Sequence, residues 1–97
     1  MPRYVALINW TDQGIAAFQD TTDRAAAGAD LAQSLGAELQ EVYWCLGPYD
    51  LVGILEAPDD ETVTAFALKL SSGGNVRTTT MRAYTREEMS SIIAKAG

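Results

Sequence analysis

Residues 37–57, AELQEVYWCLGPYDLVGILEA, decide how this chain folds. Two apolar runs, 37–46 and 49–57, are each short enough for a strand and contain several β-branched and aromatic residues. Gly47 and Pro48 lie between the runs, and this dipeptide interrupts regular structure. Such a short connection predicts a β-hairpin, with its two strands paired antiparallel.

One strand and one helix flank this hairpin on each side. The residue spacing gives a strand at 4–10, an amphipathic helix at 12–35, a second helix at 58–72 and a fourth strand at 75–84. The order β, α, β, β, α, β with right-handed crossovers predicts an α+β, ferredoxin-like fold with an antiparallel four-stranded sheet. The length of 97 residues fits one domain, spanning residues 1–97, and is too short for two.

Three of the strands are apolar on both sides, although two helices can cover only one face of a sheet. The alternating sets are Tyr4, Ala6, Ile8 and Trp10 against Val5, Leu7 and Asn9; Val42, Trp44 and Leu46 against Leu39, Tyr43 and Cys45; and Val52 and Ile54 against Tyr49, Leu51 and Leu55. An uncovered apolar face of this size predicts association. We expect two copies to pack face to face about a two-fold axis, as a dimeric α+β barrel.

A short last helix offers the alternative cover for that face. Thr85 and Glu88 have the spacing of a capping box, so a helix is predicted to begin there. Met89, Ile92 and Ile93 would form its apolar side. One short helix is too small to cover four strands, so the dimer is the favoured prediction.

The charge and the hydropathy exclude several classes of partner. Thirteen acidic and seven basic residues give a net charge of −6, without a basic patch, so we predict no nucleic-acid partner. No apolar run approaches the ~20 residues of a membrane-spanning helix, and no signal-peptide pattern is present at the start. We therefore expect a cytoplasmic protein without a membrane partner.

Histidine is absent, and Cys45 is the only cysteine. The absence of histidine removes the commonest general base at neutral pH, every histidine-activated nucleophile and most zinc sites. A single cysteine forms no disulfide within the chain. We predict neither a metal nor a cofactor, and we expect Cys45 to be a small buried apolar residue.

Asp50 and Arg77 are the candidate catalytic residues. A partly buried Asp50 carboxylate at the start of a strand could act as a base, or it could simply accept hydrogen bonds from turn amides. Arg77 could clamp a carboxylate or enolate oxygen, or it could pair with Asp50 or Glu56 in a structural role. Arg82 should lie on the opposite face of the sheet from Arg77, because their positions on the strand differ by an odd number.

Five further residues are candidates for substrate binding: Asn9, Trp10, Tyr49, Asn75 and Thr79. Their aromatic rings suit the wall of an apolar pocket, and Asn75 could help Arg77 to stabilise an oxyanion. The amides that open the helix after Thr11 could bind an anion, with Gly14 allowing a ligand to approach closely. Aromatic side chains in strands are nevertheless more often part of a core or an interface, and Thr11 to Gly14 also fits an ordinary capped helix start.

The turn Gly47-Pro48-Tyr49-Asp50 and the run 74–80, GNVRTTT, resemble the GYD-domain family of small, uncharacterised bacterial and archaeal proteins. The segments 9–14, NWTDQG, and 56–60, EAPDD, are also similar, so the resemblance covers almost the whole chain. Pro48 interrupts the eponymous Gly-Tyr-Asp but leaves the tyrosine and the aspartate in place. The resemblance implies a dimeric α+β barrel and does not imply a reaction.

Two functions remain open at this point. In the first, the dimer binds a small organic molecule in its barrel cavity and is a cofactor-independent isomerase, cyclase or oxygenase, with Asp50 as the base. In the second, the chain is a non-catalytic module for ligand sensing or oligomerisation. The sequence does not decide whether the protein is an enzyme.

Overall fold

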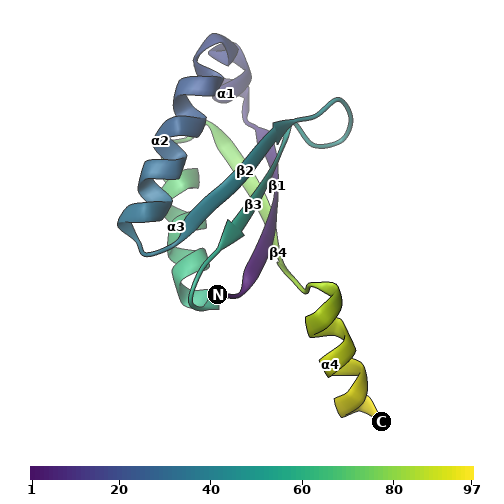
Figure 1. Cartoon of the computed structure of the whole chain (residues 1–97). Coiled ribbons are helices and arrows are strands. Elements are labelled where there is room, and N and C mark those ends of the chain that lie inside the picture. The colour runs from purple at the N-terminus through teal and green to yellow at the C-terminus, as the bar shows by residue number, and fades with distance from the viewer.

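The computed structural model describes residues 1–97 and has the predicted ferredoxin-like architecture (Figure 1). Its strands are β1 (Arg3–Trp10), β2 (Glu38–Trp44), β3 (Leu51–Glu56) and β4 (Val76–Ala83). They form one sheet in the order β2-β3-β1-β4, with every neighbouring pair antiparallel. The helices are α1 (Asp12–Ala16), α2 (Thr21–Ser34), α3 (Asp60–Ser72) and α4 (Arg86–Ala96), with a short 3-10 helix, η1 (Phe18–Asp20). None of these helices has the length and hydrophobicity needed to cross a membrane.

The core lies between the sheet and the helices α2 and α3. On β1 the buried side chains are Tyr4, Ala6 and Ile8, and on β3 they are Leu51 and Leu55. The remaining members of the core cluster are Ala32, Ala37, Ala57, Val63 and Phe66. The period of two along each strand therefore assigns one set of side chains to the helices and the other set to the opposite face.

The predicted helix at 12–35 is wrong in one respect, because the chain breaks it between α1 and α2. Arg24 donates hydrogen bonds to the carbonyls of Ala17 (2.8 Å) and Gly14 (3.1 Å), and so caps the end of α1 from the side. Ile15 and Phe18 fit the apolar spacing of a single amphipathic helix at 12–35, but 46% and 56% of their surfaces are exposed. A side chain from the next helix thus satisfies the free carbonyls and makes the break stable.

The predicted second strand also needs a correction at Leu39. A register shift between Leu39 and Glu41 moves Leu39 to the helix side, where it lies opposite Leu55. Leu39 and Val42 therefore share a face instead of opposing each other, because a bulge adds a residue to one strand only. Cys45 lies beyond the end of β2 and is exposed, whereas a buried position was expected.

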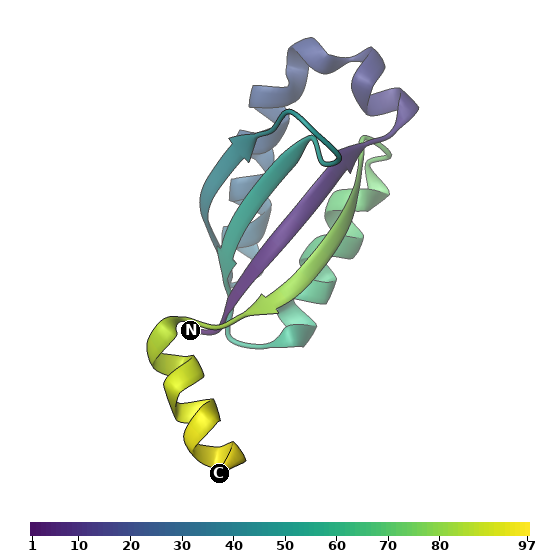
Figure 2. The ribbon, with the colours of Figure 1, turned by 90° about the vertical axis from the view of Figure 1, so that its right-hand side faces the viewer.

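The helix predicted at 58–72 begins at Asp60 instead, and the capping box predicted at Thr85 is confirmed. Asp59 caps α3 by accepting from the Thr62 amide at 2.8 Å. Thr85 and Glu88 form both hydrogen bonds of the capping box at the start of α4. That helix does not fold over the sheet, since it extends away from the body beyond the end of β4 (Figures 1 and 2).

Candidate functional site

The face of the sheet turned away from α2 and α3 is open. Figure 2 looks onto this face, with the two helices behind the strands and no helix in front of them, while the loop between β2 and β3 projects to this side at one end. Side chains from all four strands form two middle rows across it: Glu41, Ile54, Val5 and Met81, then Tyr43, Val52, Leu7 and Thr79. Six of these eight are apolar or aromatic, so the centre of the open face is an apolar surface that the chain leaves in contact with solvent.

Charged groups lie around this apolar centre. Glu38 and Glu41 are exposed on the β2 edge, and Arg77 is exposed on the β4 edge. At one end of the sheet, Arg3 pairs with Glu56 at 3.0 Å, and this hydrogen bond lowers the pKa of the Glu56 carboxyl. The two long edges therefore carry charges of opposite sign.

Tyr43 links the apolar centre to the acidic edge. Its hydroxyl donates to Glu41 Oε2 at 2.5 Å, and this bond raises the pKa of the tyrosine. The ring remains 53% exposed, as a large aromatic surface on the open face. Aromatic residues with one polar end are common at protein interfaces.

Four of the candidate site residues lie at the other end of the sheet or in the middle row next to it. Asn9 is directly opposite Arg77 on the open face, and Thr79 is opposite Leu7 in the adjoining row. Asp50 lies next to Asn9, because its amide donates to the Ile8 carbonyl at 2.9 Å. Arg77 forms no ion pair, and the predicted pairing with Glu56 is wrong because Glu56 pairs with Arg3 instead.

Asp50 holds the hairpin to the first strand. Its carboxylate accepts from the Trp10 amide at 2.9 Å, and its own carbonyl accepts from the Cys45 amide at 2.8 Å. These contacts agree with the alternative in which Asp50 has a structural role and its carboxylate accepts a hydrogen bond from a main-chain amide near the turn. Tyr49 precedes it in the loop between β2 and β3 and is half-buried.

The other two candidates are on the helix side of the sheet. Trp10 is opposite Val76 and borders the space under α2, and Asn75 lies at the start of β4. The Asn75 side chain accepts from Gln13 Nε2 at 3.0 Å, and its carbonyl accepts from the Thr11 amide at 3.0 Å. The structure therefore divides the seven candidates between the two faces and the loop, and it does not gather them into one pocket.

The predicted role of Gly14 in ligand approach is replaced by a contact within the chain. A Cβ at this position would lie 2.0 Å from the Asn75 carbonyl oxygen, so the main chain itself needs the space. The Thr11 hydroxyl accepts from the Gly14 amide at 3.1 Å. This opening of α1 is a capped helix start that packs on the turn before β4.

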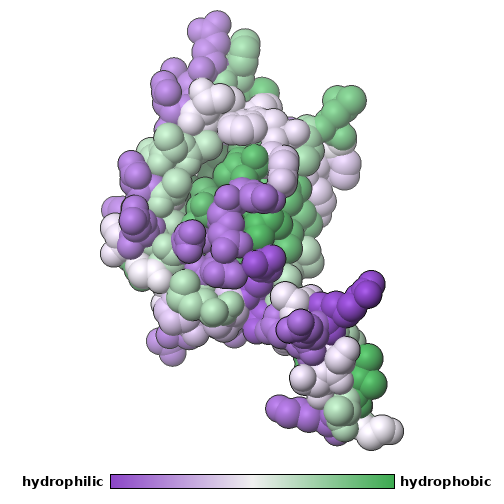
Figure 3. Space-filling view, in the orientation of Figure 1, coloured by the Kyte–Doolittle hydropathy of each residue, from purple (hydrophilic) through white to green (hydrophobic).

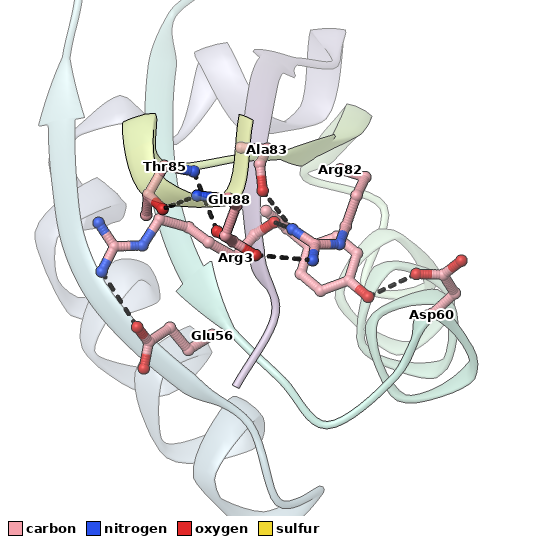
Figure 4. Close-up of polar contacts among 8 residues, drawn as sticks. Arg3, Glu56, Asp60, Arg82, Ala83, Thr85 and Glu88 are labelled. Carbon is pink, nitrogen blue, oxygen red and sulfur yellow. Dashed lines mark hydrogen bonds and ion pairs between the residues drawn. The ribbon is translucent and has the colours of Figure 1, made fainter. Parts of the chain in front are cut away.

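A polar cluster that the sequence did not reveal joins the body to α4 (Figure 4). Tyr4 donates to Asp60 at 2.5 Å, and burial, followed by this bond, raises the pKa of Tyr4 to about 12. Arg82 lies on the same side, with its guanidinium 5.6 Å from the Tyr4 ring centre, and it pairs with Glu88 of α4 at 3.4 Å. Arg82 and Arg77 are on opposite faces, as predicted from their spacing.

The last helix presents a second uncovered apolar surface. Met89, Ile92 and Ile93 are exposed by 46%, 37% and 60%, and no residue of α4 is buried. Figure 3 shows hydrophobic side chains at the centre of the body, partly hidden by hydrophilic ones, and along one side of the projecting helix. The spacing of the three residues places them on one helix face.

The sheet order, the helices on one face and the open second face define a ferredoxin-like α+β protein. Solved structures agree on this class. The leucine response regulatory protein LrpA of Mycobacterium tuberculosis superposes with a TM-score of 0.66 at 13% identity, over 87% of this chain and 51% of that one. This chain spans about half the length of that regulator, and the likeness concerns the fold alone.

The chain belongs to the GYD-domain family, whose model matches residues 4–93, and the resemblance noted in the sequence is thereby confirmed. A relative from Thermus thermophilus, named glutamine synthetase and cystathionine beta-lyase binding protein, is 34% identical over 84 residues, which are 86% of this chain and 88% of the relative. A solved crystal structure from the same species is 28% identical, with a TM-score of 0.56, over 89% of this chain and 100% of that one.

Proposed function

We propose that this protein is a non-catalytic, protein-binding module that works as a homodimer closed through the open face of its sheet. The observation that carries the proposal is the apolar centre of that face, which nothing in the chain covers. A chain of 97 residues buries only about 60–65% of its unfolded surface, so pairing two apolar faces adds burial that the monomer lacks. Aligned packing of two sheets is a common way to form such a core.

The charges on the two edges favour a second copy of the same chain as the cover. A two-fold axis parallel to the strands lays the β2 edge of one copy over the β4 edge of the other. Because this axis keeps each residue's position along the strands, Glu41 faces Met81 of the other copy, and Arg77 lies two rows further along the same edge. This orientation places edges of opposite charge together, whereas an axis perpendicular to the strands would stack the two acidic edges.

The hydrogen bonds of Asp50 and Asn75 favour a protein-binding function over a catalytic one. The Asp50 carboxylate holds the Trp10 amide, and Asn75 is held by Gln13, so both groups already have structural partners. The name of the Thermus thermophilus relative also describes binding to other proteins. We infer that this chain likewise binds a glutamine synthetase, and that the apolar side of α4 supplies the contact, as an amphipathic helix that enters a groove.

The test of this partner is a titration of the purified protein with glutamine synthetase from the same source, followed by calorimetry. The variant Ile93→Asp places a charge on the apolar side of α4, and we expect it to weaken binding at least about tenfold. Ser91→Asp introduces the same charge on the opposite side of that helix and should bind like the unchanged protein. An unchanged protein that does not bind glutamine synthetase would refute this partner, and equal effects of the two variants would refute the role of α4.

A second candidate is a small-molecule site in the dimer interface, at the row that contains Asn9 and Arg77. The pairing of these two residues on the open face, with Thr79 and Asp50 near them, supports it. In this second candidate function, the protein is a cofactor-independent isomerase, cyclase or oxygenase. Asp50 is the base, and Arg77 stabilises the oxyanion. Turnover that is lost in both Asp50→Asn and Arg77→Ala would favour it, whereas unchanged turnover in both would reject these catalytic roles.

A further inference from the structure

A cavity lies on the covered side of the sheet, away from the dimer surface. Its volume is about 290 Å³, and it extends between α2, α3 and the helix side of the strands. Small residues leave this space open, because Ala25 and Gly28 of α2 face Ala6 and Gly53 of the sheet across it. Hydrophobic residues make up 13 of the 19 that line it, so its interior suits an apolar group.

The polar side chains of this cavity come from three segments that meet at one end of the fold. Thr21 and Arg24 are in the first turns of α2, Lys69 is in the last turn of α3, and Asn75 precedes β4. No aspartate or glutamate lines the cavity. Arg24 and Lys69 are therefore the only charged residues in the lining of this cavity, in a chain whose net charge is −6.

Neither cation is neutralised by a carboxylate. The only two ion pairs in the molecule are Arg3 with Glu56 and Arg82 with Glu88. Arg24 is held in place by the carbonyls of Ala17 and Gly14, so its position is fixed while its charge remains free. Lys69 is exposed at the mouth, where a flexible ammonium can reach a bound anion.

From this arrangement we propose that the cavity binds a small apolar monocarboxylate. The hydrocarbon part enters between Leu31, Phe66 and Leu70, and the carboxylate stays at the mouth beside Lys69 and Arg24. The volume is close to the lower limit for ligand pockets, which fits a short aliphatic chain and excludes a nucleotide cofactor. The site lies on the opposite face of the sheet from the dimer surface, so it does not depend on the proposed function.

Octanoate is the probe, and calorimetry with the full-length protein measures its binding. We expect Lys69→Met to weaken binding about tenfold, because a charge-assisted contact is lost while the apolar stem is kept. Lys95→Met makes the same change on α4, outside the cavity, and should leave binding unchanged. Octanol, which has the same chain without the charge, should bind more weakly than octanoate.

A pair of cavity variants tests the position of the ligand. Ala25→Leu fills the cavity and should abolish octanoate binding, whereas Ala26→Leu, on an exposed and non-lining position of α2, should leave it intact. Thermal unfolding of both variants shows that each is folded. No binding of octanoate by the unchanged protein, or equal binding by the variants Ala25→Leu and Ala26→Leu, would overturn the proposal. Binding that persists in a monomeric Leu7→Asp variant would show that the site is independent of the dimer.

Discussion

The two faces of the sheet are made by alternate residues of the same strands, yet this chain covers only one of them. On β1, Tyr4, Ala6 and Ile8 are buried under the helices, while Val5 and Leu7 between them remain partly exposed. The two sets are similarly apolar, so composition does not distinguish them. The two faces differ because α2 and α3 cover only one of them. An apolar strand face therefore predicts that the face is buried, but it does not identify the helix or partner that covers it.

The largest expected effect is on the covered face. Leu55 has 1% of its surface exposed, so Leu55→Ala should lower the free energy of unfolding by about 2–5 kcal/mol, measured by urea denaturation. Leu68 on α3 is 70% exposed, and Leu68→Ala should change it by less than about 0.5 kcal/mol. Similar losses from both substitutions would mean that the covered face is not the core.

The next effect is on the open face and concerns association. Leu7→Asp places a charge in the middle of the proposed interface and should raise the dimer dissociation constant at least about 100-fold, measured by sedimentation velocity. Leu68→Asp makes the same change on the outer side of α3 and should remain dimeric. Circular dichroism should report a folded chain for both variants. A Leu7→Asp protein that stays dimeric would move the interface away from this face.

A smaller effect is expected where the covered side meets the turn before β4. Gly14→Ala would put a Cβ 2.0 Å from the Asn75 carbonyl oxygen, so it should destabilise the fold by about 1–3 kcal/mol. Gly73→Ala is the matched control, since its Cβ would meet its nearest neighbour at 3.6 Å and the φ of Gly73 is −68°. The two free energies of unfolding give the comparison, and an equal cost would contradict the tight packing at Gly14.

The sequence predicted the fold because local signals agree with it at most of the helices and strands. The hairpin around Gly47 and the capping box at Thr85 both lie where the sequence places them. The break between α1 and α2 was missed, because it depends on Arg24 reaching back to two carbonyls of the preceding helix. Side-chain capping across a break leaves no periodic signal in the sequence.

The site was less predictable than the fold, for a related reason. Asp50 and Asn75 have residue types suited to catalysis, but their partners are main-chain and side-chain groups that are distant in the sequence. The cavity beside Lys69 was missed because it depends on the space between two helices and the sheet. Its only trace in the sequence is the run of small residues around Gly28, which also fits close packing.

The smallest effect concerns α4 and its dependence on pH. The Thr85 amide and the Arg82 guanidinium lower the pKa of Glu88 in the folded protein. A lowered folded pKa stabilises the helix start fully above the pKa of an unfolded glutamate, about 4.3, and this stabilisation is lost as the pH falls through the folded value. The protection factors of the α4 amides against exchange should therefore fall in acid before those of the β1 amides do. Glu88→Gln keeps a capping side chain and should remove this pH dependence, and a dependence that persists would assign it to another group.

The solvent exposure of the methyl groups on the open face shows whether a second copy of the chain covers this face. A soluble gadolinium chelate increases the relaxation rate of methyl protons that it can approach, and NMR measures this rate residue by residue. We expect Leu7, Val52 and Ile54 to be protected nearly as well as Leu55, because a second copy covers them. If they relax clearly faster than Leu55, toward the rates of the exposed Leu46 and Leu68, the open face is in contact with water and the proposed homodimer is wrong.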